Sequence, residues 1–259
     1  MSKEHFWSQW MKEFLSSGTD LTYVHEIYTS EAKKPSKKTF HSAKQGDVIT
    51  KKIRVVCRKC NSGWMGSLEE KVKPILIKLI ENSVTSLLTI EQKLLSEWIT
   101  MKALVAEHSE GGTQITPIQD RKAFYLHQLI PSYFSIYIGV HNTSSKSGFV
   151  RNSIALSPSK SLEKNVKELN LKGLVKNTQS ISFICGKLFI YILASRVDGI
   201  NIRDRFDLSL MVRICPKEKD RIEWPISPSL SEIELSDITH SLTHLASKAK
   251  YAGPLKKQD

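Results

Sequence analysis

The hydrophobic residues of this chain change their spacing between its two halves, and this change constrains the fold more than any other feature. From Ser62 to Ile80, and again over about 90–108, apolar residues recur at steps of three and four, which is the period of an amphipathic helix. A third, shorter helix is expected at 121–129. Pro74 lies within the first stretch, where it should kink the helix or restart it.

Beyond residue 130 the apolar residues alternate with polar ones, which is the period of a half-buried strand. The strands predicted from this alternation are 134–140, 149–156, 181–193 and 208–214. The third of them should be bent or bulged at Gly186. A last helical pattern covers 231–248. Helices that precede and follow strands of antiparallel type predict an α+β fold.

The N-terminal part has a different organisation from the rest. Residues 1–15 have an amphipathic helical pattern, and residues 16–50 are polar, lysine-rich and turn-rich, as in a long loop. A short β-prone run at 53–56 leads into a Cys-x-x-Cys turn. We therefore expect a small module at 1–82, followed by a helical and antiparallel-sheet domain at 83–259.

The charge of the chain favours an anionic partner. Its formal net charge is +12 and its pI is about 9.5, and residues 1–64 alone hold twelve Lys or Arg against six Asp or Glu. A surplus of this size attracts nucleic acid through the release of counterions. The basic runs lie at 33–38 and 51–54, just before the Cys-x-x-Cys turn. Each run is also compatible with a solvated loop whose charge only confers solubility.

The cysteines predict a metal site in a reducing compartment. Cys57 and Cys60 form one Cys-x-x-Cys turn, whereas Cys185 and Cys215 lie in apolar runs typical of core residues. In a cytoplasmic protein, a Cys-x-x-Cys turn is usually metal-binding or redox-active. No signal-peptide pattern and no apolar run of about 20 residues is seen, so we expect a cytoplasmic protein without a membrane segment.

Two segments carry the most specific pattern of the chain. It opens with Ser2-Lys3-Glu4-His5, and residues 56–69 read Val-Cys-Arg-Lys-Cys-Asn-Ser-Gly-Trp-Met-Gly-Ser-Leu-Glu. Looser similarity continues in residues 98–104, residues 184–188 and Trp224-Pro225. Together these segments resemble the HNH, or ββα-metal, endonuclease superfamily, and within it a group of bacterial HNH-like proteins. The family normally carries a further Cys-x-x-Cys shortly before the acid–His dipeptide, and this sequence contains none there.

The resemblance implies a small ββα-metal and zinc-knuckle module that cuts DNA. His5 would be the general base, Glu4 and Asn61 would hold a catalytic Mg²⁺ or Mn²⁺ ion, and RNA is a further substrate to consider. Cys57 and Cys60 would bind a structural Zn²⁺. The remaining ligands of this site either precede the present sequence, or are supplied by other residues such as His25 or His41, or have been lost. The basic residues expected to contact phosphates are Lys33, Lys34, Lys37, Lys38, Lys51, Lys52, Arg54, Arg58 and Lys59.

Plainer roles compete with these assignments. His5 lies where chain ends fray, and Asn is also a favoured helix N-cap. Trp64 is expected to be a core residue beside the cysteines. The alternatives to a nuclease are a non-catalytic zinc-knuckle protein that binds nucleic acid, and a module that binds a protein partner or a second copy of itself.

Overall fold

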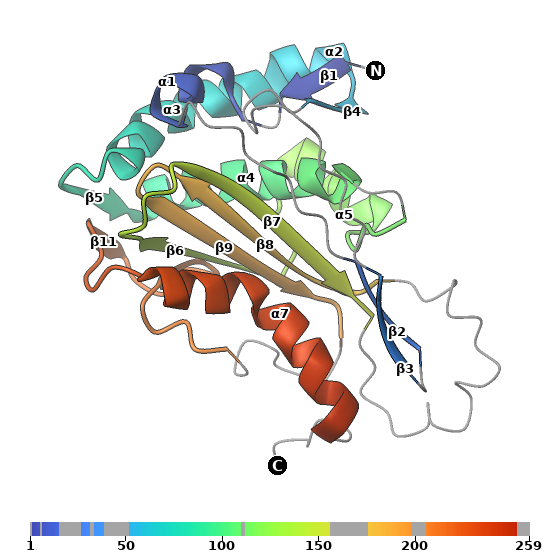
Figure 1. Ribbon diagram of the computed structural model, residues 1–259. Coiled ribbons are helices and arrows are strands. Elements are labelled where there is room, and N and C mark those ends of the chain that lie inside the picture. Colours follow the sequence, from blue (N-terminus) through green and yellow to red (C-terminus); the bar gives the residue numbers. More distant parts are fainter. Residues whose placement is uncertain are drawn as a thin grey trace.

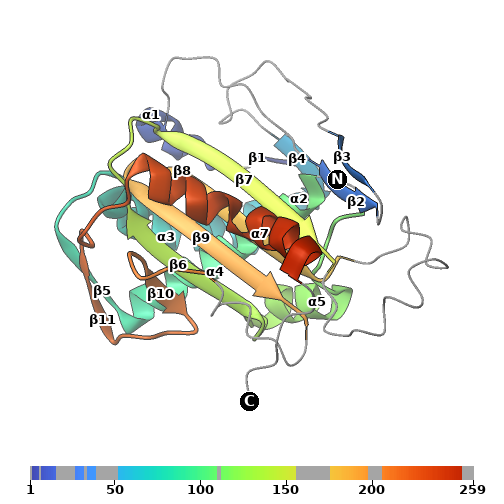
Figure 2. The same cartoon turned by 60° about the horizontal axis from the view of Figure 1, so that its bottom comes forward.

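The structure is a computed structural model, and it describes residues 2–5, 7–15, 27–31, 34–38, 52–109, 112–155, 176–197 and 206–252. Both helices and antiparallel sheets are present, so the predicted α+β fold class is confirmed. Figure 1 shows the arrangement, and Figure 2 shows it from below. Within the described residues, none of the helices combines the length and the apolar character needed to cross a bilayer.

The N-terminal segment begins as a strand, and the helix expected over residues 1–15 is therefore wrong in its first third. Strand β1 (Ser2–His5) is followed by a 3-10 turn η1 (Gln9–Met11) and a short helix α1 (Lys12–Leu15). Met11 and Leu15 are the buried residues of this turn and helix, and Trp7, which precedes the turn, is buried with them. They lie four residues apart, so one helical face meets the core, while Trp10 and Phe14 on the adjoining face are only half-buried.

Three further strands lie in the N-terminal part. Strands β2 (Ile27–Glu31) and β3 (Lys34–Lys38) form an antiparallel hairpin inside the segment that was expected to be a loop. Strand β4 (Lys52–Val56) pairs with β1 rather than with this hairpin. The predicted β-prone run before the cysteines is thereby confirmed.

The cysteine turn leads into a long helical segment. Helix α2 (Arg58–Cys60), the π-helical turn η3 (Asn61–Met65) and helix α3 (Gly66–Ile80) follow one another, with a non-helical backbone at Gly63. The kink lies at Gly63 and not at Pro74, which is exposed inside a continuous α3. The apolar residues of α3 on either side of Pro74 are buried in one core, and this burial holds the helix together across the proline.

The next elements form the centre of the molecule. Strand β5 (Thr85–Leu88) leads into helix α4 (Thr89–Ala106), whose first turn is closed by a hydrogen bond from the Leu88 N–H to the Glu91 carboxylate at 2.8 Å. A 3-10 turn η4 (Glu107–Ser109) and helix α5 (Ile118–His127) follow. Most of the second half of α4 is buried, because α3 covers one side of it and the sheet covers the other.

The main sheet has five antiparallel strands. Their spatial order is β10 (Val212–Cys215), β6 (Phe134–Val140), β9 (Leu188–Ser195), β8 (Thr178–Cys185) and β7 (Ser147–Ile154). The segment predicted as one bent strand is two strands, β8 and β9, joined by a tight turn at Gly186 and Lys187. Gly186 has a φ of +59°, which a glycine at the first position of a two-residue hairpin turn adopts without strain. Strand β11 (Arg221–Trp224) pairs with β5 apart from this sheet.

The layers explain where the core sits. Helices α3 and α4 cover one face of the main sheet, and helix α7 (Glu232–Ala252) covers the other, as Figures 1 and 2 show. Helix α7 begins with a capping box, in which Ser231 and Glu234 exchange backbone and side-chain hydrogen bonds. One apolar cluster joins Trp7, Ile53 and Met65 of the N-terminal part to the α4 face of the sheet.

Candidate functional site

Strand β1 brings the acid–His dipeptide beside the strand that leads to the cysteines. In the antiparallel pair, Ser2 lies opposite Val56, Glu4 opposite Ile53 and His5 opposite Lys52, with an irregularity between Ser2 and Glu4. Because β4 runs directly into the cysteine turn, the two motifs that are separated in sequence form one strand–strand–helix unit. The upper right of Figure 1 shows this unit as β1, β4 and α2.

The turn itself, Cys57 to Asn61, is called the knuckle below. The Cys57 sulfur accepts a hydrogen bond from the backbone N–H of Cys60 at 3.1 Å, so that it caps α2. The two sulfurs lie 2.8 Å apart, with Cys57 exposed and Cys60 half-buried. This separation is longer than a disulfide bond of about 2.05 Å. The cysteines are therefore free thiols that face each other on one turn.

The hydrogen bonds within the knuckle give the two thiols different pKa values. The pKa of Cys57 is lowered because the side chain and backbone N–H of Cys60 both hydrogen-bond to its sulfur. The pKa of Cys60 is raised, first by its hydrogen bond with Cys57 and then by partial burial. Cys57 is consequently the thiol that ionises first, and the thiolate is the form that binds a metal.

The knuckle fits half of a structural zinc site. A closed zinc site needs four ligands, and two cysteines separated by two residues supply two of them on one turn. In the part of the chain that the structure describes, no group of three or more His, Cys, Asp or Glu side chains is placed to hold a metal ion. His25 and His41, which were considered as further ligands, lie outside the described residues.

Asn61 does not act as a helix N-cap. Its backbone is helical, with φ −61° and ψ −52°, and its N–H donates to the Cys57 carbonyl at 3.0 Å. The capping role belongs to Cys57, whose sulfur accepts a hydrogen bond from the Cys60 N–H. Asn61 is half-buried and opens the π-helical turn η3, at the position where the resemblance expects a metal ligand.

Tertiary contacts place η4 and α5 against this unit. The sequence did not indicate these contacts. An ion pair of 2.5 Å between Lys102 and Glu69 joins α4 to α3, and η4 at the end of α4 lies against β4. On the other side, Trp64 of η3 contacts Phe124 and Tyr125 of α5, each with ring centroids 5.9 Å apart. Short-range patterns carry no signal for these contacts.

His108 is the titratable residue that the tertiary structure adds near this unit. It is exposed, and its Nε2 lies 3.0 Å from Nη1 of Arg121. A guanidinium only donates, so Nε2 accepts and the ring proton sits on Nδ1. The pKa of His108 is lowered, first by partial burial and then by the charge of Arg121. The lowered pKa favours the neutral ring, in which Nδ1 carries the proton.

Behind His108 lies a buried polar cluster, called the Glu107 network below. Glu107 is fully buried, and its carboxylate accepts hydrogen bonds of 2.6 Å from both Thr116 Oγ1 and Gln179 Nε2. It also forms an ion pair with Arg121, whose Nη1 donates to the Leu104 carbonyl as well. The polar groups of the network form hydrogen bonds with one another, as expected of a buried cluster with a structural role.

The predicted phosphate contacts divide between several elements. Lys34, Lys37 and Lys38 are on β3, Lys52 and Arg54 are on β4, and Lys33 and Lys51 lie outside the described residues. Arg58 and Lys59 are exposed on α2, directly within the knuckle. These two cations are the ones whose side chains the structure places at the candidate site.

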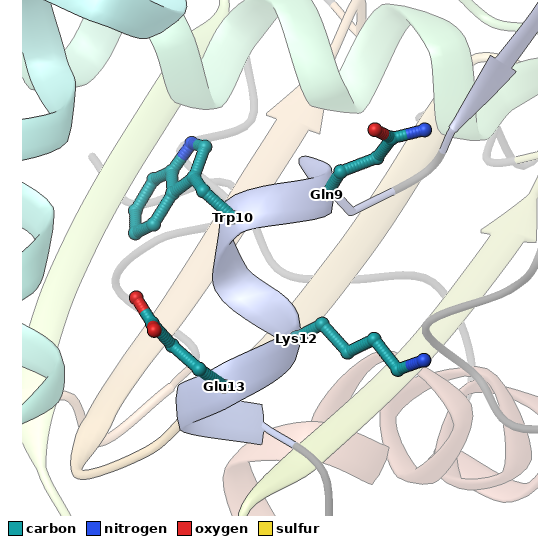
Figure 3. A pocket seen from close by; sticks show the side chains of 4 residues that line it. All are labelled: Gln9, Trp10, Lys12 and Glu13. Atoms are coloured by element: carbon teal, nitrogen blue, oxygen red, sulfur yellow. The ribbon is translucent and has the colours of Figure 1, made fainter.

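Two hollows of the described surface lie away from the candidate site. An open hollow of about 600 Å³ is lined by Gln9, Trp10, Lys12 and Glu13. Figure 3 shows Trp10 and Glu13 on one side of this turn and Gln9 and Lys12 on the other, so their polar groups do not converge. A second hollow, of about 310 Å³, lies beside His141. The ring nitrogens of His141 are hydrogen-bonded to the Gly186 carbonyl and to the Thr143 hydroxyl. Neither hollow contains a predicted site residue.

Comparison with known proteins found no family model, no curated protein and no solved structure that matches this chain.

Proposed function

We propose that the protein is an HNH-like endonuclease that hydrolyses DNA phosphodiester bonds with a divalent metal ion. The observation that carries this proposal is the pairing of β1 with β4, which sets the strand of Glu4 and His5 beside the strand that runs into Asn61. The proposal joins this geometry to the motif resemblance and to the net charge of +12. A reduced thiol pair suits a cytoplasmic location.

The roles follow from the chemistry of each residue type. His5 takes the proton from the attacking water, which is the role of a general base. Glu4 and Asn61 supply oxygen ligands, which Mg²⁺ or Mn²⁺ prefers. When bound, the ion neutralises charge that develops on the phosphate. Cys57 and Cys60 hold a separate zinc that keeps the knuckle closed, and Arg58 and Lys59 contact phosphates.

Plasmid nicking tests the proposal. The wild-type protein with Mg²⁺ or Mn²⁺ is expected to relax supercoiled DNA, and EDTA is expected to stop the reaction. His5→Ala should slow nicking by about 10²–10⁴-fold, since a general base contributes a factor of that order. His244→Ala is the matched control, because this exposed histidine lies on α7, across the sheet from α4. Nicking by His5→Ala at the wild-type rate contradicts the assignment.

A second candidate function is supported by the half-site at the knuckle. Two zinc ligands without a third among the described residues also suit a non-catalytic protein that binds nucleic acid. Salt-dependent DNA or RNA binding without nicking would favour this function. If no nucleic acid binds at low salt, a module for a protein partner or for self-association becomes the better assignment.

A further inference from the structure

An exposed tyrosine next to the knuckle is the starting observation. Tyr125 is 45% exposed, although it belongs to a helix that packs against the core through Phe124. Its ring meets the ring of Trp64 edge to face, with centroids 5.9 Å apart and an interplanar angle of 64°. Nearly half of Tyr125 is therefore open to solvent while its orientation is supported by Trp64.

Trp64 itself packs against a buried residue, Phe124. Phe124 is 1% exposed and contacts Trp64 edge to face at 5.9 Å. Trp64 stands three residues after Asn61 in the same π-helical turn. The exposed ring of Tyr125 thus contacts a residue of the same turn that begins with the candidate metal ligand Asn61. We call the surface formed by Trp64 and Tyr125 the aromatic platform.

The charges around the aromatic platform are mostly positive. Arg58 and Lys59 are exposed on α2, and the segment from Arg58 to Met65 contains no acidic residue. Lys122 is exposed on α5, three residues before Tyr125. The acidic residue of α5, Asp120, accepts a hydrogen bond from the Tyr133 hydroxyl at 2.8 Å. In both Figures 1 and 2, α5 lies at the same end of the molecule as α2, β1 and β4.

Aromatic rings flanked by cations are the chemistry that binds unpaired bases. A base offers a flat face to an aromatic ring whatever its sequence, and cations hold the adjoining phosphates. Bases inside a duplex are stacked on one another, so their faces are not accessible to a protein ring without unstacking.

We propose that the aromatic platform stacks an unpaired base, so that the preferred substrate is a single strand or a junction with unpaired nucleotides next to the cut. This inference rests on the proposed function, because it places the platform beside the candidate metal ligands. Tyr125 provides the stacking face, and Trp64 holds it in position. Arg58, Lys59 and Lys122 contact the phosphates on either side of the stacked base.

Fluorescence anisotropy with a labelled DNA single strand and the matching duplex tests the proposal, without metal, so that binding is separated from cutting. The wild-type protein should bind the single strand more tightly than the duplex. Tyr125→Ala should weaken single-strand binding by about tenfold and change duplex binding much less, as expected for the loss of one stacked base. Tyr125→Phe keeps the ring and should bind as the wild type does. The circular dichroism spectrum checks that each variant is folded.

Leu126→Ala is the matched control, because Leu126 is an exposed neighbour on the same helix with no ring. It should leave single-strand binding unchanged. Equal single-strand affinity of Tyr125→Ala and the wild type would overturn the proposal, as would a wild type that prefers the duplex or binds neither probe. If Tyr125→Ala and Leu126→Ala both alter the oligomeric state while affinity for DNA is unchanged, the surface binds protein instead and the proposal is again wrong.

The binding assay and the nicking assay test the two proposals separately. Loss of single-strand affinity in Tyr125→Ala, in a protein that does not nick DNA, supports the platform and rejects the nuclease. Nicking that is unaffected by Tyr125→Ala on single-stranded and duplex substrates supports the nuclease and rejects the platform.

Discussion

The knuckle and the Glu107 network are two polar clusters near the same end of α4, and they differ in how their polar groups are satisfied. In the network, a fully buried carboxylate is surrounded by Thr116, Gln179 and Arg121. In the knuckle, the Cys57 sulfur is exposed and the two thiols have mainly each other and a backbone N–H as partners.

This difference separates a structural role from a candidate functional one. A buried charge must be paired within the protein, because an unpaired one is very costly. An exposed thiol pair adds little to stability, and its ligand capacity remains open for a metal. Removing groups from the network should therefore affect folding, whereas removing the exposed cations of the knuckle, Arg58 and Lys59, should affect binding and leave folding nearly unchanged.

The largest effect on stability is expected at Glu107. Glu107→Ala leaves the partly buried Arg121 without its carboxylate, which should lower the free energy of unfolding by about 3–5 kcal/mol. Urea denaturation followed by circular dichroism measures this loss. Glu223→Ala is the control, because its pair with Arg221 is exposed, with side chains 68% and 61% accessible, and should cost less than about 1 kcal/mol. A loss at Glu107 no greater than at Glu223 would show that the buried network is not a structural cluster.

Two glycines extend the comparison to the backbone. A Cβ at Gly186 would lie 2.6 Å from the Ile80 carbonyl oxygen, and its φ is +59°. Gly186→Ala should therefore cost about 1–3 kcal/mol, because the hairpin turn docks on the end of α3. At Gly63 in η3, a Cβ would meet no atom within 4 Å. Gly63→Ala should therefore lower stability less than Gly186→Ala does. Thermal unfolding measures the stability of both variants. Equal losses of stability would show that the backbone of η3 is as tightly constrained as the hairpin turn at Gly186.

The cysteines should differ in reactivity. Cys57 has a lowered pKa and is exposed, so its thiolate forms at a lower pH than that of Cys60, whose pKa is raised. Cys185 is fully buried and its pKa is raised well above normal by burial. Alkylation with iodoacetamide as pH rises should therefore label Cys57 first, Cys60 later, and Cys185 only on unfolding. Peptide mass spectrometry reads the order. Added Zn²⁺ should protect both knuckle cysteines, and alkylation of Cys60 ahead of Cys57 would contradict the assigned hydrogen bonds.

The smallest effect on stability is expected at the knuckle cations. Arg58→Ala and Lys59→Ala are exposed changes and should alter the free energy of unfolding by less than about 0.5 kcal/mol. If these side chains contact phosphates, each change should lower the slope of log affinity against log salt by about one unit. A salt titration of DNA binding measures the slope. Lys219→Ala, an exposed cation between β10 and β11, is the control and should leave the slope unchanged.

Much of the secondary structure was predictable because its signals are local. The helix expected at 90–108 is α4 with η4, and the strand expected at 134–140 is β6. Errors arose where contacts distant in sequence override local preference. Pro74 remains within a continuous helix because the residues around it are buried, and the apolar run around Gly186 reverses because its turn docks on Ile80. Residues 2–5 form a strand because β4 offers a pairing edge.

The candidate site was predictable only in part, for the same reason. The knuckle is local, so the spacing of Cys57 and Cys60 was enough to predict two thiols on one turn. His108 and Tyr125 were not predicted as site residues, because only the packing of α4 and α5 brings η4 against β4 and Tyr125 against Trp64.

The sequence by itself determined the α+β class, the main helices and strands, the basic charge and the thiol pair, because these depend on composition and on spacing within a few residues. Only the tertiary structure decided that the first strand lies along the strand leading into the knuckle, and that the exposed ring of Tyr125 contacts Trp64 just after it. Such pairings join residues far apart in the chain, and their free energy comes from burial and hydrogen bonds that exist only once the core has formed.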